Sequence, residues 1–144
     1  MKDEYVTAFH ELITETTAKY GYSLPTDIEA YLVMLLSSYV EQPDFLPRPG
    51  FAENYLQLSV RKPYHAKQLG DVCLFVTGVF PEYGNRAGLN VTYFTNIGKT
   101  SYHVASVNMN NTLFDILCQH FQICTEVLNA ATNKKPQSIW DILL

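Results

Sequence analysis

Apolar residues near the start of the chain recur at the spacing of one helical face. This first stripe consists of Tyr5, Phe9, Leu12, Ile13 and Tyr20. Gly21 follows it at the position where a helix usually takes its C-terminal cap. A second helix is predicted to begin near Thr26, because Thr26 and Glu29 have the spacing of a capping box. Its apolar stripe is Ile28, Leu32, Leu35, Leu36 and Tyr39.

Prolines and Gly50 mark residues 41–50 as an irregular connector, and helical spacing returns after it. A weakly patterned helix is expected over 51–60, and a helix that Pro81 ends is expected over 64–80. Three more are expected over 90–107, 112–131 and, as a short helix, 138–144. Asn90 and Asn111 are expected caps, and 81–88 an exit loop. Strand-like alternation is nearly absent. The pattern predicts an all-α, single-domain bundle of about six helices spanning 1–144, with a central apolar helix near 64–80 and a short C-terminal helix.

Asp71 is the anomaly of the central helix, because a carboxylate removed from water needs a partner. Three explanations are open. Asp71 caps a helix that restarts after Gly70, or it pairs with Arg86, Lys67 or a tyrosine hydroxyl, or it belongs to a functional site together with Glu82 and Arg86 of the exit loop. The small residues Gly70 and Gly78 predict close approach of a neighbouring helix.

Composition and charge narrow the class of protein. The chain has 144 residues, 47% of them hydrophobic and 17% charged, which is typical of a folded globular domain. A formal net charge of −4 and only isolated basic pairs argue against nucleic-acid binding. An 18-residue apolar window and a signal-peptide pattern are both absent, so no membrane partner is expected. The 3 cysteines suit free thiols in a reducing compartment, which predicts a cytoplasmic location.

Several motifs that could indicate catalysis have simpler explanations. Gly98-Lys99-Thr100 resembles the end of a phosphate-binding loop, but Tyr93 stands where that loop needs its first glycine. The histidines lack the spacing of a helical zinc site, and His120 shares a face with apolar residues, so we expect it to be a hydrogen-bonded core residue. Cys73 lies among apolar neighbours, which favours inert packing. We therefore expect no metal, no cofactor and no catalytic residue.

A longer pattern follows Leu69. It comprises Leu69-Gly70-Asp71, Gly78-x-Phe80-Pro81-Glu82, Arg86, Tyr93-Phe94 and Gly98-x-x-x-Tyr102. This pattern resembles an uncharacterised family of bacterial proteins with the form LGD…GxFPE…R…Y(Y/F)…GxxxY, over roughly residues 65–106. The chain has Phe94 where the pattern often has a second tyrosine. The resemblance implies a bacterial, cytoplasmic origin and no particular activity.

Two functional hypotheses follow. The first is a non-catalytic protein that acts through protein–protein contact, with an unknown partner or as a homodimer. Its candidate interface is the C-terminal helix, with Trp140, Leu143 and Leu144. The alternative is a ligand-binding or enzymatic bundle with a polar cleft around Asp71 and Arg86. Its candidate residues are Asp71, Glu82, Arg86, Tyr93 and Tyr102.

Overall fold

A computed structural model of the chain describes residues 2–41, 63–81 and 91–134, and every structural statement below concerns these residues. They form helices and no strand, so the all-α prediction is confirmed. The helices are α1 (Lys2–Tyr20), α2 (Thr26–Glu41), α4 (Pro63–Val79), α6 (Val91–Met109), α7 (Thr112–Gln119) and α8 (Phe121–Lys134). None of these helices is both long and apolar enough to cross a bilayer.

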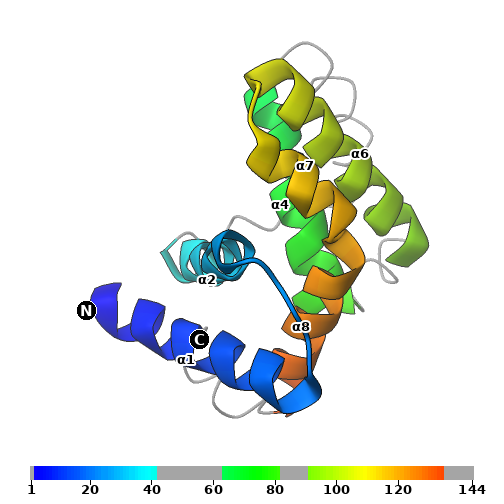
Figure 1. Cartoon of the computed structure of the whole chain (residues 1–144). Coiled ribbons are helices and arrows are strands. Elements are labelled where there is room, and N and C mark those ends of the chain that lie inside the picture. The colour runs from blue at the N-terminus through cyan, green and yellow to red at the C-terminus, as the bar shows by residue number, and fades with distance from the viewer. Residues whose placement is uncertain (1, 42–62, 82–90, 135–144) are drawn as a thin grey trace.

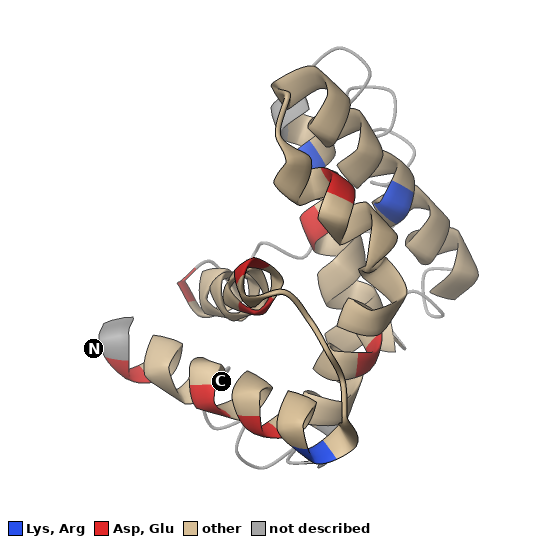
Figure 2. Cartoon of the chain, viewed as in Figure 1, with Lys and Arg blue, Asp and Glu red and all other residues tan. Residues whose placement is uncertain are grey.

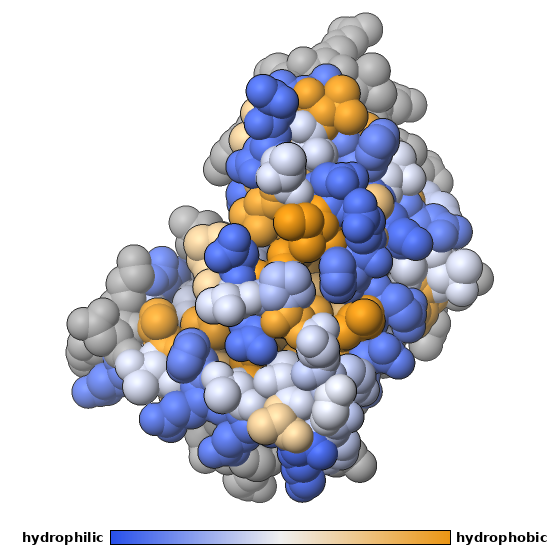
Figure 3. Space-filling model, viewed as in Figure 1, coloured by the Kyte–Doolittle hydropathy of each residue, from blue (hydrophilic) through white to orange (hydrophobic). Residues whose placement is uncertain are grey.

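The described helices form two groups (Figure 1). Helices α4, α6, α7 and α8 make an upright body in which α7 and α8 follow one another along α4. Helices α1 and α2 pack on each other beside this body, where α1 meets α8 and α2 meets α4 and α7. In Figure 3, hydrophobic side chains gather in the angle between the two groups and hydrophilic ones surround them. A single cluster of buried apolar residues extends through both groups.

The central apolar helix is confirmed as α4. Each of its residues from 69 to 79 is buried, because α6, α8 and α2 pack around it. Its glycines allow the close approach that the sequence predicts. A Cβ atom added to Gly70 would lie 2.6 Å from the ring of Tyr102 on α6, and one added to Gly78 would lie 2.6 Å from Leu128 on α8. Any side chain at either position would push a neighbouring helix away.

The cap predictions can be compared with the backbone at three helix ends. Gly21 has φ +70° directly after α1, and the amide of Tyr22 donates to the carbonyl of Thr17, as expected for a glycine cap. The side chain of Asn111 accepts from the amide of Leu113 at the start of α7. Helix α2 begins at Thr26, but the amide of Glu29 donates to the carbonyl of Pro25, so Thr26 is the first helical residue and not the predicted N-cap. The expected elements at 51–60 and 138–144, the cap Asn90 and the interface residues Trp140, Leu143 and Leu144 lie outside the described residues.

One open explanation for Asp71 is excluded, and one prediction about helix continuity was wrong. Helix α4 runs through Gly70 without a break, so Asp71 caps no restarted helix. The expected helix 112–131 is instead two helices that meet at His120. The amide of His120 donates to the carbonyl of Ile116, and its Nδ1 atom lies 3.0 Å from the same oxygen. His120 has φ −99° and ψ 14°, which separates the two helices although neither a glycine nor a proline marks the position in the sequence.

Candidate functional site

Asp71 is held by three donors from three helices. Its Oδ1 atom accepts hydrogen bonds from the hydroxyl of Tyr31 on α2, at 2.6 Å, and from the hydroxyl of Tyr102 on α6, at 2.7 Å. Its Oδ2 atom accepts from the ammonium of Lys67, one turn earlier on α4, at 2.7 Å. These four residues are called the Asp71 cluster below. The cluster joins α2, α4 and α6 where the two groups of helices meet.

The local sequence explains why these side chains converge. Lys67 and Asp71 are four residues apart, which places them on one face of α4. Gly70 leaves room for the ring of Tyr102 against the backbone of α4. Tyr102 stacks on Phe114 with ring centroids 6.1 Å apart, and Tyr31 meets both rings edge-on. The hydroxyls are therefore aimed at Asp71 by packed aromatic rings.

The electrostatics of the cluster favour neutral phenols at Tyr31 and Tyr102. Burial raises the pKa of Tyr31 far above its usual value, and the negative charge of Asp71 raises it further. The pKa of Tyr102 is raised for the same two reasons, again with burial first. Both hydroxyls consequently remain protonated donors at any physiological pH. Asp71 is 7% exposed, and three donors compensate for the water that it has lost.

The candidate site residues from the sequence do not all come together. Asp71 and Tyr102 are in contact, and the predicted pairing of Asp71 with Lys67 and a tyrosine hydroxyl is present. Tyr93 precedes Tyr102 by nine residues on α6, which turns it to the opposite side of that helix, where its ring meets Phe94. Glu82 and Arg86 lie outside the described residues.

Tyr31 is the member of the cluster that the sequence analysis missed. It is 5% exposed and lies one turn before Leu35, within the buried side of α2. A tyrosine at such a position needs a buried partner for its hydroxyl, just as Asp71 needs donors. Matching these two demands would have suggested the pair.

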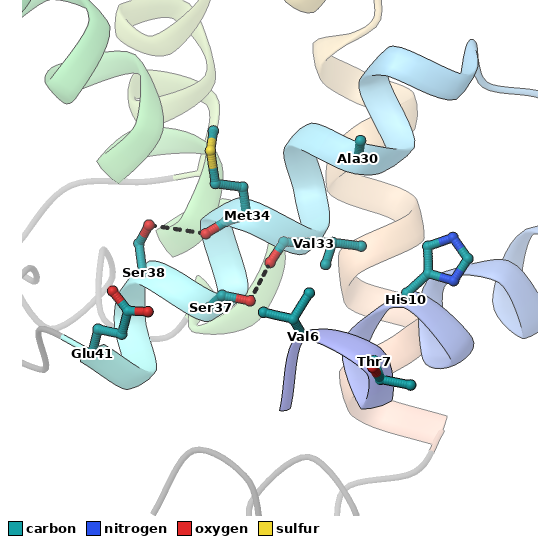
Figure 4. A pocket seen from close by; sticks show the side chains of 9 residues that line it. All are labelled: Val6, Thr7, His10, Ala30, Val33, Met34, Ser37, Ser38 and Glu41. Carbon is teal, nitrogen blue, oxygen red and sulfur yellow. Dashed lines mark hydrogen bonds between the residues drawn. The ribbon is translucent and has the colours of Figure 1, made fainter. Parts of the chain in front are cut away.

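A groove lies between α1 and α2, away from the Asp71 cluster (Figure 4). It has a volume of about 500 Å³ and is open to solvent. The residues that line it are Val6, Thr7, His10, Ala30, Val33, Met34, Ser37, Ser38 and Glu41. We call it the α1–α2 groove.

The walls of the α1–α2 groove are more apolar than their residue types suggest. The Ser37 hydroxyl donates to the carbonyl of Val33 at 2.8 Å, and the Ser38 hydroxyl donates to that of Met34 at 2.9 Å (Figure 4). Both hydroxyls are thus occupied by the helix itself. Met34 is 49% exposed, a large fraction for an apolar side chain. The groove therefore offers a flexible thioether and branched aliphatic side chains to an incoming molecule.

One end of the α1–α2 groove is fastened by a hydrogen bond between the two helices. The hydroxyl of Tyr5 near the start of α1 donates to Oε1 of Glu41 at the end of α2, at 2.8 Å. Residues 6–10 of α1 face residues 30–41 of α2 across the groove, so one wall is about one turn long and the other about three turns. The bond links the two walls at this end.

The α1–α2 pair is strongly acidic. Its described side chains include six acids, Glu4, Glu11, Glu15, Asp27, Glu29 and Glu41, and one basic residue, Lys19. Lys19 lies in the last turn of α1, at the end away from the groove. In Figure 2 the acids are distributed along both helices. The groove is consequently an apolar surface in a field of negative charge.

A second hollow of about 420 Å³ lies where the end of α1 meets α4, α6 and α8. Its lining includes Tyr20, Tyr22, Pro81 and Val91. Asp71 lines neither this hollow nor the α1–α2 groove.

The cysteines pack as apolar residues. Burial raises the pKa of Cys73 well above its usual value and that of Cys124 to about 12. Cys118 is less buried, and its pKa is raised more modestly, chiefly by partial burial. Within the described ranges, His, Cys, Asp and Glu side chains form no group of three that could hold a metal ion.

Comparison of the chain with protein-family models, with characterised proteins and with solved structures found no match. The resemblance to a bacterial family described above therefore stays a prediction.

Proposed function

We propose that the protein acts through protein–protein contact and not by catalysis, and that the α1–α2 groove is its docking surface. The observation that carries this proposal is the apolar lining of the groove, in which Met34 is 49% exposed beside half-buried Val6 and buried Val33. The two serine hydroxyls next to these side chains are already bonded to their own helix. An exposed apolar surface with a polar surround is the usual form of a docking site.

The Asp71 cluster supports the same proposal, because its polar groups already bond one another. Its carboxylate already accepts three hydrogen bonds, and both hydroxyls that reach it are committed donors. Such a junction holds helices together, and its groups would have to leave their partners before they could meet a ligand. We therefore assign the cluster to the fold. Free cysteines and the resemblance to bacterial proteins support a cytoplasmic setting.

A photoreactive side chain in the groove tests the proposal. Benzoylphenylalanine would replace Met34 in one variant and Val107, an exposed residue of α6, in a control. After irradiation in cells of the source organism, we expect a discrete protein adduct from position 34 and none from position 107. The purified partner should then bind the wild-type chain and bind Met34→Ser at least tenfold more weakly.

The alternative is a small apolar ligand, since a volume of about 500 Å³ lies within the range of small-molecule sites. Native mass spectrometry of the purified chain distinguishes the two. A retained small molecule that Met34→Ser releases, together with no adduct from position 34, would replace the proposal by ligand binding. An adduct of the chain with itself would identify the contact as a homodimer.

A further inference from the structure

We propose that the occupant of the α1–α2 groove is an amphipathic helix of a partner protein whose apolar stripe is flanked by lysine or arginine. This inference rests on the proposed function and adds the chemistry of the partner. The groove and its charges carry it in three steps.

The first step is the shape of the groove. It extends along α2 from Ala30 to Glu41, which corresponds to about 16 Å or three helical turns. The wall from α1 is shorter, since it consists of Val6, Thr7 and His10, about one turn. An amphipathic helix of about three turns that lies along α2 can meet this surface with side chains at i, i+3 or i+4, and i+7.

The second step is the position of the charges beside the groove. On α1, Glu4 lies one turn before the lining residue Thr7, and Glu11 lies one turn after it. These three residues therefore lie on one face of the helix. On α2, Asp27 lies two turns before Met34, and Glu41 lies two turns after it. Acidic side chains therefore flank both walls. A helix seated in the groove would bring its own flanking residues to these acids.

The third step is the comparison of possible occupants. A second copy docking by the same groove would bring Glu4, Glu11, Asp27 and Glu41 towards the same four acids of its partner, which is unfavourable. The segment after Lys134 has one basic residue, Lys135, at its start, and its apolar end SIWDILL carries Asp141 and no basic residue. A basic helix is attracted by the field of the groove and gains specificity from it. Charge complementarity thus selects a basic partner helix over both of the others.

Two model peptides test the inference on the full chain. Each has about 14 residues, enough for three to four turns, with leucine at i, i+4, i+7 and i+11. One peptide has lysine on both flanks of this stripe, and the other has glutamate at the same positions. Fluorescence anisotropy of the labelled peptides would measure both affinities. We expect the basic peptide to bind, the acidic one to bind at least tenfold more weakly, and the preference to shrink between about 50 and about 300 mM salt.

Paired variants then locate the binding. Met34→Ser should weaken the basic peptide about tenfold or more, whereas Met109→Ser should not, although both methionines are similarly exposed at 49% and 41%. Glu11→Gln with Asp27→Asn should weaken it about three- to tenfold. The control removes the same charge from the body, with Asp115→Asn and Glu126→Gln, and should leave the affinity unchanged.

Other outcomes overturn the inference in distinguishable ways. Equal binding of both peptides that Met34→Ser abolishes would leave the docking surface intact and remove the basic partner. Binding of the basic peptide that is unaffected by Met34→Ser would place it elsewhere and remove the inference. A change of oligomeric state in Met34→Ser would identify a second copy as the occupant. A red shift of Trp140 emission in Met34→Ser, without peptide, would identify the chain's own terminal segment instead.

The failure of this inference and the failure of the proposed function are separate results. If neither peptide binds, the basic-helix inference is wrong. The proposed function would still be judged by the adduct from position 34, which requires no assumption about charge.

Discussion

The Asp71 cluster and the α1–α2 groove contain similar residue types and use them in opposite ways. In the cluster, a carboxylate and three donors are buried and bond one another across α2, α4 and α6. In the groove, serine hydroxyls bond their own helix, and Met34 and the surrounding acids face solvent. Polar groups that satisfy one another stabilise a fold, whereas an apolar side chain left exposed within a charged surround is available to a partner. This contrast explains why the most unusual residue of the sequence is assigned to structure.

The largest effect is expected from Asp71→Ala. This change leaves two buried hydroxyls and the Lys67 ammonium without their acceptor, and breaking a buried charge pair typically costs about 3–5 kcal/mol. We expect the free energy of unfolding, measured by urea denaturation, to fall by that amount. Asp115→Ala is the matched control, because Asp115 accepts a bond from Gln119 in an exposed setting, and it should cost about 1 kcal/mol or less. Equal losses for the two variants would contradict the structural role of the cluster.

The next effect concerns the two hydroxyls separately. Tyr31→Phe and Tyr102→Phe each remove one donor to a charged acceptor, with an expected cost of about 1.5–3 kcal/mol in the free energy of unfolding. Tyr5→Phe removes a comparable bond to Glu41 at an exposed site and should cost about 1 kcal/mol or less. A loss for Tyr5→Phe as large as that for Tyr102→Phe would mean that burial does not decide these energies.

Gly70→Ala tests the close contact between α4 and α6. The added Cβ would meet the Tyr102 ring at 2.6 Å, and this ring is fixed by its hydroxyl bond to Asp71. Overpacking typically costs about 1–3 kcal/mol, which outweighs the gain of about 1 kcal/mol from alanine's helix propensity. The same change in a Tyr102→Phe background should cost less, because the ring is then free to shift. A double-mutant cycle with no coupling would refute this explanation.

The reactivity of the thiols distinguishes buried cysteines from partly exposed ones in the wild-type chain. Because burial raises the pKa values of Cys73 and Cys124, the latter to about 12, both remain thiols at pH 8. Cys118 is only partly buried and should react first with an alkylating reagent. Mass spectrometry of the labelled chain should show one modified cysteine before unfolding and three after it. Early labelling of Cys73 would indicate that α4 is not the closed centre of the fold.

The smallest effect on stability is expected in the groove. Met34→Ser removes an exposed side chain and should change the free energy of unfolding by less than about 0.5 kcal/mol, although it weakens docking strongly. Thermal denaturation beside Met109→Ser would verify this. A large loss of stability would mean that Met34 packs as part of the core.

Local sequence signals predicted much of the fold. The apolar stripes and the glycine after Tyr20 gave α1 and α2 close to their observed bounds, although Thr26, the predicted cap of α2, is its first helical residue. The apolar run before Pro81 gave α4. The junction at His120 was missed because neither a glycine nor a proline marks it in the sequence. A helix end was therefore predicted where a local residue such as a glycine or proline marks it, and it was missed where no such residue is present.

The sites were harder to predict, because they depend on which helices meet. Asp71 was recognised as a buried acid in need of partners, and Lys67 was among the partners considered. Tyr31 was missed because it lies 40 positions away in the sequence, and only packing brings it to Asp71. The α1–α2 groove was not foreseen, since its apolar lining depends on how two helices meet and on serine hydroxyls that fold back.

The most direct test of the central claim is a methyl NMR titration of the full chain. With ¹³C-methyl methionine, Met34 reports on the groove and Met109 on the far end of α6, in one sample and without a mutation. On addition of the basic peptide, we predict that the Met34 signal shifts in a saturable manner while the Met109 signal stays in place. A saturable shift of Met109 with Met34 unchanged would contradict the account, because docking would then occur away from the α1–α2 groove.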